Sequence, residues 1–318
     1  MHLHIAYSSD NNYVPFLGTS IISLLENNKV FKKITLHILS NKITEDSKNK
    51  LEEIVQQYKR EAIFYDFSDI EDRLKGIKVK TIAISAYSRL FLTDVLPESV
   101  TKIIYLDCDS IILGSYEELW NSPIDDYYMM GVQDVIPDFF KDKIGLDKKD
   151  LYVNSGMLYM NIEKMRINDS KKMIRAFMDS FSGEIPHHDQ GVMNGLFSKN
   201  CNILKPRYNC MTPFFLMSSR NLKSFYKMDD FYLDNELEEA VSNPVFIHFT
   251  ESYLTRPWVK GSKHPFVKEF LRYKSMTPWS DMPLKDDTRT FSLKMVAFLF
   301  KILPFSIFML FLKLMKAN

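Results

Sequence analysis

The sequence predicts an α/β fold built around a parallel sheet. Over residues 3–67, short apolar segments typical of strands alternate with amphipathic segments typical of helices. We expect strands at 3–8, 33–39 and 61–67, and helices at 13–28 and 44–60. Thr44, followed by Glu45, is a suitable N-cap for the second helix. Strands that alternate with helices indicate crossover connections, and therefore a parallel sheet.

The rest of the chain continues the alternation of strands and helices, and one strand ends at a candidate ligand site. We expect helices at 84–94, 163–181 and 189–197, and strands at 102–106, 127–132, 158–162 and 244–249. The strand 102–106 runs directly into Asp107-Cys108-Asp109, and a turn at Asn154-Ser155-Gly156 is expected to precede the strand 158–162. Because open α/β sheets bind ligands beyond the carboxyl ends of their strands, we expect the acidic cluster at the functional site.

Length, charge and cysteine content narrow the class of protein. The 318 residues suit one large domain, or one domain with a tail. Lysine and arginine total 41 against 40 acids, so there is no global argument for nucleic-acid binding. Cys108, Cys201 and Cys210 form no C-x-x-C pair, which fits a reducing cytosol. Residues 1–5 lead straight into a strand, so no secretory signal is expected.

Asp107 and Asp109 are candidates for binding a divalent cation. Two carboxylates two residues apart on an extended segment point the same way. Their oxygens suit Mg²⁺ or Mn²⁺, and such an ion neutralises a diphosphate and the charge that grows on it as a sugar leaves. The alternative is an ordinary polar strand end. Apolar residues on both sides place these acids near the core, where unpaired carboxylates are costly, so the flanks favour a bound cation.

Together with this cluster, five motifs in a fixed order resemble glycosyltransferase family 8, which includes bacterial lipopolysaccharide galactosyl- and glucosyltransferases and glycogenin. The motifs are Ala6-Tyr7-Ser8-Ser9-Asp10-Asn11-Asn12-Tyr13; Ala86-Tyr87-Ser88-Arg89-Leu90 with Ile104-Tyr105-Leu106-Asp107-Cys108-Asp109; Tyr152-Val153-Asn154-Ser155-Gly156; His188-Asp189-Gln190 with Asn194-Gly195-Leu196-Phe197; and His248-Phe249 with Arg256-Pro257-Trp258. They span residues 3–280, and their order is far more specific than any one of them.

The resemblance implies a GT-A fold, a single α/β domain with a Rossmann-like nucleotide-binding half. It also implies a UDP-sugar donor, Mn²⁺ (or Mg²⁺), and retention of the anomeric configuration. Asp107 and Asp109 match the metal ligands of the family, and His248 matches the third one. Without the family motif, a buried core histidine would be the better interpretation of His248.

The resemblance also assigns residues that bind the donor. Ala6, Tyr7 and Ser8 match the walls of the uridine pocket, Asp10 and Asn12 match uridine contacts, and Arg89, Arg256 and the Asp107-Cys108-Asp109 cluster match the diphosphate side. On local sequence, Asp10 and Asn12 equally suit a helix N-cap region, and Arg89 an ordinary helix salt bridge.

Asp134, Asn154, Asp189 and Gln190 match positions that line the donor-sugar and acceptor side, and with Arg89 they form the expected catalytic set. Asp189 would accept hydrogen bonds from sugar hydroxyls; a helix start is the alternative for the segment around it. Gln190 falls where a nucleophile is expected, but an amide is a poor nucleophile. The hypothesis is front-face attack through a tight ion pair, with Gln190 stabilising the oxocarbenium-like carbon.

Four positions depart from the family pattern. Arg256 stands where lysine is frequent, Glu251 stands near a usual glycine, and the segment between them looks longer. Gly191 replaces an acid that many members carry, which favours the ion-pair hypothesis. Thr81 stands where some members have a phosphate-contacting histidine, so no phosphate role is assigned there.

The composition changes near the C-terminus, so we divide the chain into a GT-A domain at 1–285 and a basic amphipathic tail at 286–318. Residues 291–318 hold four lysines and no acid among mostly Phe, Leu, Ile and Met. Lys301 and Pro304 interrupt the apolar run, which disfavours a membrane-spanning helix. We expect an interfacial anchor on anionic lipid. The alternative is a helix packed on the catalytic domain.

These features predict a cytoplasmic enzyme, peripheral at the inner face of the plasma membrane. It would transfer glucose or galactose from UDP-glucose or UDP-galactose to a cell-envelope glycan or glycolipid. One alternative is a glycoprotein acceptor. Another is a non-catalytic, membrane-associated interaction protein on a decayed scaffold. The intact set of Asp107, Asp109, His248, Asp189 and Gln190 argues against decay.

Overall fold

The computed structural model describes residues 1–75, 77 and 84–316. Thr81 lies outside the described residues. The strands are β1 (His2–Asp10), β2 (Lys33–Asn41), β3 (Glu61–Asp66), β4 (Lys102–Leu106), β5 (Ser110–Ile112), β6 (Met129–Gln133), β7 (Val153–Asn161), β8 (Cys201–Ile203), β9 (Cys210–Met211) and β10 (Phe246–His248). The first half of the chain therefore has the alternating strands and helices that its hydrophobic pattern predicts.

The helices divide between the body and the tail of the molecule. Those of the body are α1 (Val14–Asn27), α2 (Glu45–Gln57), α3 (Ile70–Arg73), η1 (Ile84–Phe91), α4 (Leu92–Val95), α5 (Glu117–Asn121), α6 (Phe139–Asp142), α7 (Ile162–Ile167), α8 (Ser170–Ser180), α9 (His188–Phe197), η2 (Ser198–Asn200), η3 (Pro206–Tyr208), η4 (Thr212–Phe215), α10 (Ser219–Tyr226), α11 (Asp234–Ser242) and α12 (Val267–Lys274). The tail forms α13 (Phe291–Ile302) and α14 (Phe305–Lys316).

A seven-stranded sheet in the order β3-β2-β1-β4-β7-β6-β8 forms the centre of the molecule. β3, β2, β1 and β4 run parallel, as predicted, but β7 is antiparallel to both β4 and β6. A second sheet, β5-β10-β9, begins just beyond the end of β4. The reversal at β7 matters for the site, because it brings the start of β7 beside the carboxyl end of β4.

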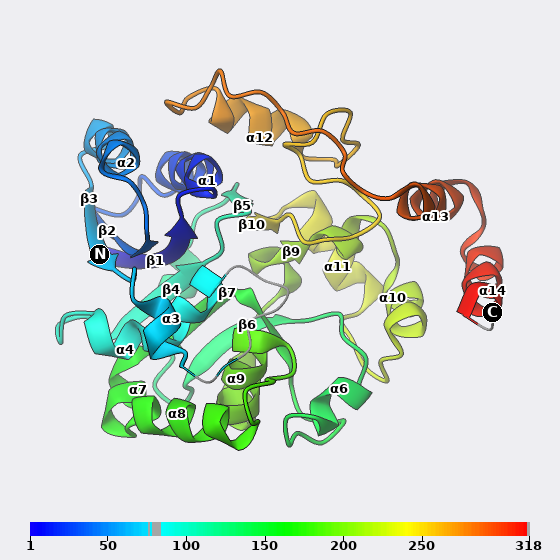
Figure 1. Ribbon diagram of the computed structural model, residues 1–318, viewed down its shortest axis with the longest axis horizontal. Helices are drawn as coiled ribbons and strands as arrows, with labels where there is room; N and C mark the ends of the chain where they lie inside the picture. Colours follow the sequence, from blue (N-terminus) through cyan, green and yellow to red (C-terminus); the bar gives the residue numbers. More distant parts are fainter. Residues whose placement is uncertain (76, 78–83, 317–318) are drawn as a thin grey trace.

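Two layers of helices cover the large sheet, with α1 and α2 on one face and α7, α8 and α9 on the other (Figure 1). Successive strand residues alternate between two buried cores: Ile104 and Leu106 pack with the α1 side, while Ile103 and Tyr105 pack with the α9 side. Side chains of a strand point alternately to the two faces of the sheet, so this pattern shows that the strand is buried on both faces.

Three predicted elements differ in detail. Asn154-Ser155-Gly156 is no turn but the start of β7, where the Gly156 carbonyl accepts a hydrogen bond from Asp107 N (2.8 Å). The expected helix 163–181 is divided at Asp169, whose positive φ of 49° ends one helix and whose side chain caps α8. The segment 84–94 is helical, but it winds as a tighter 3₁₀-helix up to Phe91. The Thr44 cap of α2 is as predicted, accepting from Ser47 N.

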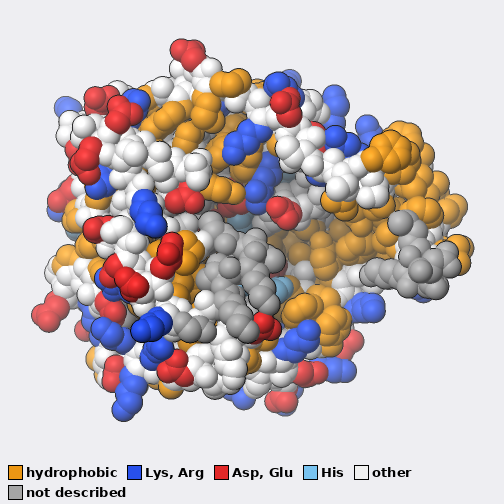
Figure 2. All heavy atoms as spheres, viewed as in Figure 1, with side chains coloured by type: hydrophobic (Ala, Val, Ile, Leu, Met, Phe, Trp, Pro, Cys, Tyr) orange, Lys and Arg blue, Asp and Glu red, His pale blue; other side chains and the backbone are white. Residues whose placement is uncertain are grey.

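The tail is a pair of helices separated at Pro304 and attached to the body through aromatic contacts. Phe300 stacks on Tyr253 with ring centroids 4.6 Å apart, and Phe308, wholly buried, meets the same tyrosine at 5.5 Å. Its exposed large apolar side chains are Phe291, Leu293, Met295, Phe298, Ile302, Ile307, Leu310 and Leu314. Figure 2 shows hydrophobic side chains gathered at the right-hand edge, where this tail lies. Across the described residues, no helix is long and apolar enough to span a bilayer.

Three histidines, His2, His4 and His37, lie together on β1 and β2. His4 Nδ1 lies 3.0 Å from His37 Nε2, and His37 Nδ1 lies 2.9 Å from the Tyr65 hydroxyl. The His2 ring lies 3.9 Å from the His4 ring, centroid to centroid. Burial, reinforced by the neighbouring imidazoles, lowers the pKa of His37 to about 3 and that of His4 to about 4. These side chains therefore fold in their neutral form.

This group predicts a loss of stability in weak acid. The unfolded chain takes up a proton on His37 near pH 6.5, whereas the folded chain does not, so stability is complete above that pH and falls as the pH drops. We expect about 2 kcal/mol less from His37 at about pH 5 than at about pH 7.5. Urea unfolding at both pH values measures this difference. His37→Gln should flatten the dependence by that amount, and an unchanged slope in the variant would contradict the assignment.

Candidate active site

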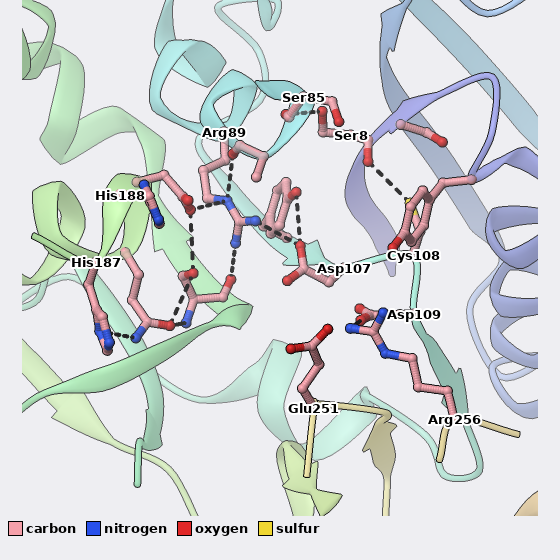
Figure 3. Close-up of a pocket in the computed structure, with 17 residues that line it drawn as sticks. Ser8, Ser85, Arg89, Asp107, Cys108, Asp109, His187, His188, Glu251 and Arg256 are labelled. Atoms are coloured by element: carbon pink, nitrogen blue, oxygen red, sulfur yellow. Dashed lines mark hydrogen bonds and ion pairs between the residues drawn. The ribbon is translucent and has the colours of Figure 1, made fainter. Parts of the chain in front are cut away.

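Eight of the predicted site residues meet in a pocket of about 430 Å³ beyond the ends of β1 and β4 (Figure 3). Of the predicted site residues, Ser8, Arg89, Asp107, Cys108, Asp109, Asp189, Gln190 and Arg256 line it. They come from β1, η1, the β4–β5 connection, α9 and the segment after β10, so the pocket joins parts of the chain that are far apart in sequence.

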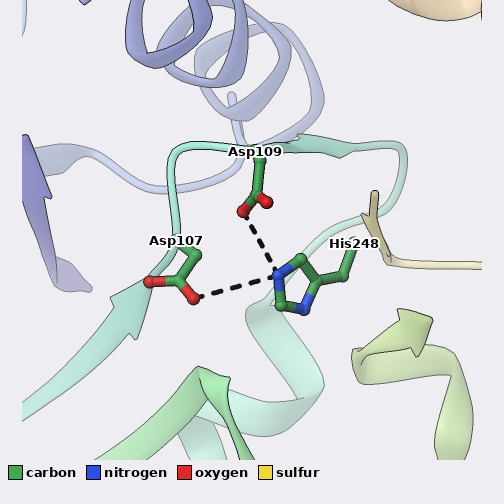
Figure 4. Close-up of side chains that lie close together, drawn as sticks. All are labelled: Asp107, Asp109 and His248. Carbon is green, nitrogen blue, oxygen red and sulfur yellow. Dashed lines mark ion pairs between the residues drawn. The ribbon is translucent and has the colours of Figure 1, made fainter. Parts of the chain in front are cut away.

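Asp107, Asp109 and His248 form one cluster, shown in Figure 4. β10 pairs antiparallel with β5, and this register sets His248 opposite Ser110, beside the two acids. His248 Nε2 lies 3.2 Å from Asp109 Oδ1 and 3.8 Å from Asp107 Oδ2. One ligand atom from each residue lies within 4.8 Å of the others, as binding to a common ion requires.

The charges of this cluster favour a cation. Burial opposes ionisation of Asp109, but His248 and Arg256 outweigh it and leave the pKa of Asp109 at about 2. Burial also opposes a charge on His248, but Asp109 and Asp107 raise its pKa overall. The imidazole thus faces two carboxylates that attract positive charge. Two carboxylates and an imidazole are a donor set that suits Mn²⁺, so the residues fit a divalent ion.

Gly156 leaves the space that His248 occupies. A Cβ built on Gly156 would lie 2.1 Å from His248 Cε1 and 2.6 Å from its Nδ1. The start of β7 therefore forms a close backing for the imidazole, and this position requires glycine because of the close approach rather than because of its φ.

Arg89 connects the two acidic parts of the pocket. Its Nη2 donates to Asp107 Oδ1 (2.8 Å), its Nε lies 2.9 Å from Asp189 Oδ2, and its Nη1 donates to the Ser155 carbonyl. Its guanidinium also lies over the Tyr105 ring at 4.2 Å. Burial opposes its charge, but Asp107 and Asp189 raise the pKa of Arg89 overall. Arg89 thus holds both carboxylates in place.

Asp189 has an unusual environment for a carboxylate. Burial, together with the nearby charge of Asp107, raises the pKa of Asp189 to about 6 against the opposing effect of Arg89. The side chain is 4% exposed, and it lies at the first turn of α9. An acid of this kind, close to a pocket, is typical of functional sites.

Gln190 is held from both ends. Its Oε1 accepts from Ser155 N (2.9 Å) and Asn154 Nδ2 (3.3 Å), and its Nε2 donates to Asp134 Oδ2 (2.7 Å). Gln190 lines the pocket, whereas Asp134 and Asn154 lie behind it and fix the orientation of its amide. Asn154 Oδ1 in turn accepts from Asn209 Nδ2 at 2.9 Å.

Arg256 closes the side of the pocket opposite Arg89. Its Nη2 donates to Asp109 Oδ2 (3.1 Å), and its Nε donates to the Phe249 carbonyl (2.9 Å). Glu251 lines the pocket on the same side, as Figure 3 shows. Cys108, between the two acids, is buried, with its thiol donating to the Ser8 carbonyl (3.1 Å).

The residues expected at the uridine site have different surroundings in the structure. Ala6 and Tyr7 are wholly buried in the two cores, whereas Ser8 and Ser9, nearer the carboxyl end of β1, line the pocket. Asp10 Oδ1 accepts from Asn12 N (2.9 Å) and Tyr13 N (3.1 Å), so it caps the turn before α1. Neither Asp10 nor Asn12 lines the pocket in this conformation, whereas Ser8 does.

Several pocket residues were not among the predicted ones. They are Ser9, Tyr13, Ser85, Ala86, Tyr105, Ser155, His187, His188 and Glu251. Most of them lie within or next to the motifs that carry the family resemblance, so those motifs could have identified them. Tyr105 lies two residues before Asp107, so strand geometry would have placed both side chains on the same face. Ser155 directly follows the predicted residue Asn154.

Comparisons with known proteins show which family the chain resembles. The family model for glycosyl transferase family 8 matches residues 4–261. General stress protein A of Bacillus subtilis (strain 168) is 25% identical over 87% of this chain and 95% of its own length. Lipopolysaccharide 1,2-glucosyltransferase of Escherichia coli is 27% identical over 89% of this chain and 80% of its own. Lipopolysaccharide 1,3-galactosyltransferase of Salmonella typhimurium is 26% identical over 92% and 84%.

Among solved structures, the galactosyltransferase LgtC in complex with donor and acceptor sugar analogs has a TM-score of 0.72 and 23% identity, covering 87% of this chain and 96% of that one. This likeness shows the GT-A fold, as predicted, and the family match defines a glycosyltransferase. The chain belongs to glycosyltransferase family 8.

Proposed function

We propose that this enzyme transfers glucose or galactose from a UDP-sugar to a glycan or glycolipid of the cell envelope, with retention of configuration. The observation that carries the proposal is the convergence of Asp107, Asp109 and His248 beside a pocket flanked by Arg89 and Arg256. Relatives named lipopolysaccharide glucosyl- and galactosyltransferases support the choice of sugar and acceptor.

In this proposal, Asp107, Asp109 and His248 hold Mn²⁺ or Mg²⁺. When bound, the ion supplies positive charge against the donor diphosphate. Arg256, which lines the pocket, keeps Asp109 oriented and offers its remaining donors to a phosphate. Arg89 is already engaged with Asp107, Asp189 and Ser155, so its role is to position the two acids.

Asp189 and Gln190 act on the sugar side in this proposal. Asp189 accepts hydrogen bonds from sugar hydroxyls, and Gln190 stabilises positive charge at the anomeric carbon as UDP leaves. Asp134 and Asn154 hold the amide of Gln190, which reduces the reorganisation needed during the reaction. The amide of Gln190 is a poor nucleophile, which argues against a covalent intermediate on this side chain. Front-face attack through an ion pair needs no such intermediate.

UDP release from a panel of UDP-sugars, with Mn²⁺, Mg²⁺ or chelator, tests the proposal. We expect release that depends on the metal and is fastest with UDP-glucose or UDP-galactose. Equal UDP release in the presence of chelator would show that no metal is needed. If no donor gives UDP, the result would favour a non-catalytic protein on a decayed scaffold. Mass measurement of the protein itself after incubation identifies a protein acceptor.

Gln190→Ala is expected to lower kcat about a hundredfold while leaving donor affinity nearly unchanged, because the amide acts on charge that develops only in the transition state. Single-turnover kinetics and UDP-sugar binding separate the two quantities. Gln56→Ala, an exposed glutamine on α2, is the matched control. A full transfer rate in the Gln190 variant would rule out this role.

We also propose that residues 1–285 form the catalytic domain, while residues 286–318 hold it at the inner face of the plasma membrane. The eight large exposed apolar side chains of the tail support this, as do its lysines, which suit anionic headgroups. The aromatic contacts of Phe300 and Phe308 with Tyr253 keep the tail on the body at the same time.

Replacing Leu293 and Leu310 together with aspartate should weaken binding to phosphatidylglycerol vesicles at least about tenfold, because two apolar side chains lose their burial in the bilayer. Vesicle sedimentation measures this. Ile167→Asp, which changes a more exposed apolar residue on α7, should leave binding unchanged. Vesicle binding that survives in the double variant would reject the anchor.

A further inference from the structure

A second cavity, of about 750 Å³, lies between the tail and the body of the molecule. Its tail side is formed by Ala297, Phe298, Phe300 and the helix connection at Leu303, and its body side by the segments 215–216 and 253–255. The cavity is larger than the catalytic pocket, and most of the residues that form these two sides are apolar. We call it the tail groove.

The charged residues of the tail groove all have the same sign. Lys263, Arg289, Lys294 and Lys301 line it, and its described lining contains no acid. Arg289 and Lys294 are engaged with Asp287. Lys263 and Lys301 are exposed, and among the described residues neither has an ion-pair partner. Apolar walls with two available cations fit an amphiphile that has an acyl chain and a phosphate.

One loop separates the tail groove from the catalytic pocket. Glu251 and Arg256 line the pocket, while Tyr253, Leu254 and Thr255 between them line the groove. Three residues of chain span at most about 10 Å. The tail also holds this loop, since Arg289 donates to the Tyr253 carbonyl (3.0 Å) and Phe300 stacks on the Tyr253 ring. A molecule in the groove therefore lies next to the sugar-transfer site.

We propose that the tail groove binds the lipid end of the acceptor: an acyl chain lies between α13 and the 253–255 segment, and its phosphate meets Lys263 and Lys301. This rests on the proposed function, in which the acceptor is a glycolipid. It assigns the groove a task distinct from that of Leu293, Ile307 and Leu310, which are exposed outside it and suit the bilayer surface. The groove would then select acceptors by their lipid.

Direct binding tests the groove without any need for activity. The full chain is irradiated with dodecyl phosphate that carries a diazirine in its chain, and the adducts are mapped by mass spectrometry. We expect adducts at 215–216, 253–255 and 297–305. Ala297→Trp fills the groove and should remove them, whereas Leu293→Trp, which adds the same side chain outside the groove, should not. Labelling only of the outer apolar residues, or labelling that Ala297→Trp leaves intact, would overturn the proposal.

Acceptor kinetics test the consequence for transfer. UDP release is measured with hexosides offered in pairs, as the methyl glycoside and as the dodecyl phosphate glycoside. Lys263→Gln and Lys301→Gln should each raise KM for the lipid member about fivefold and leave KM for the methyl glycoside unchanged. Lys313→Gln, a tail lysine outside the groove, is the matched control.

The two proposals fail in different ways. If both members of a pair accept the sugar and the lysine variants do not change either KM, the groove proposal is wrong and the transferase proposal is unaffected. If no donor and acceptor pair gives UDP, the transferase proposal fails, and photolabelling still decides whether the groove binds an anionic amphiphile.

Discussion

Asp109→Asn is expected to reduce metal-dependent transfer by at least about a hundredfold. Asparagine has nearly the shape of aspartate, so the backbone of the β4–β5 connection is preserved. The change removes one of two negative charges that face His248 Nε2, 3.2 Å away, and it leaves Arg256 without its carboxylate partner. Because the pKa of Asp109 is held at about 2, the wild-type side chain is ionised throughout the neutral range and is available to a cation.

Two measurements separate loss of metal from loss of folding. Titration of UDP release with Mn²⁺ should show a much weaker response in the variant, and the rise in Tm that Mn²⁺ causes in the wild type should disappear. Asp46→Asn, at an exposed aspartate on α2, changes charge equally and should alter neither quantity. A variant that keeps both responses would show that Asp109 is no ligand.

Gly156→Ala should also weaken metal binding, although Gly156 offers no ligand atom. The added methyl group would lie 2.1 Å from His248 Cε1, closer than atoms can approach, and His248 is buried. Either the imidazole or the start of β7 must move. Loss of a group that orients a metal ligand typically costs 10- to 100-fold in affinity, and we expect about a hundredfold for Mn²⁺.

A double-mutant cycle identifies the cause. If the methyl group acts only through the imidazole, Gly156→Ala adds little to the effect of His248→Ala, so the two changes are strongly non-additive. Gly114→Ala is a suitable control, because its nearest neighbour would be 3.1 Å away and a small shift of Val245 relieves it. Additive losses, or wild-type Mn²⁺ affinity in Gly156→Ala, would contradict this geometry.

The amino-acid sequence alone determined the alternating strands and helices of the first half of the chain and one half of the candidate metal site. Apolar residues at 102–106 made a strand whose bounds match the prediction, and Asp107 and Asp109 follow it directly. Local hydrophobic pattern and cap chemistry suffice for such features, because they depend on neighbours a few residues away. The family motifs extended this to His248, Asp189 and Gln190.

Only the tertiary structure decided how distant segments meet. His248 reaches the acids because β10 pairs with β5 in one particular register, and no local pattern specifies that register. Tyr7 lies in the core while Ser8 and Ser9 line the pocket, since only the carboxyl end of β1 reaches it. The close approach of Gly156 to the imidazole and the packing of the tail on Tyr253 likewise depend on the tertiary structure. Packing between segments that are distant in the sequence depends on shape and register, which the sequence encodes only through the complete fold.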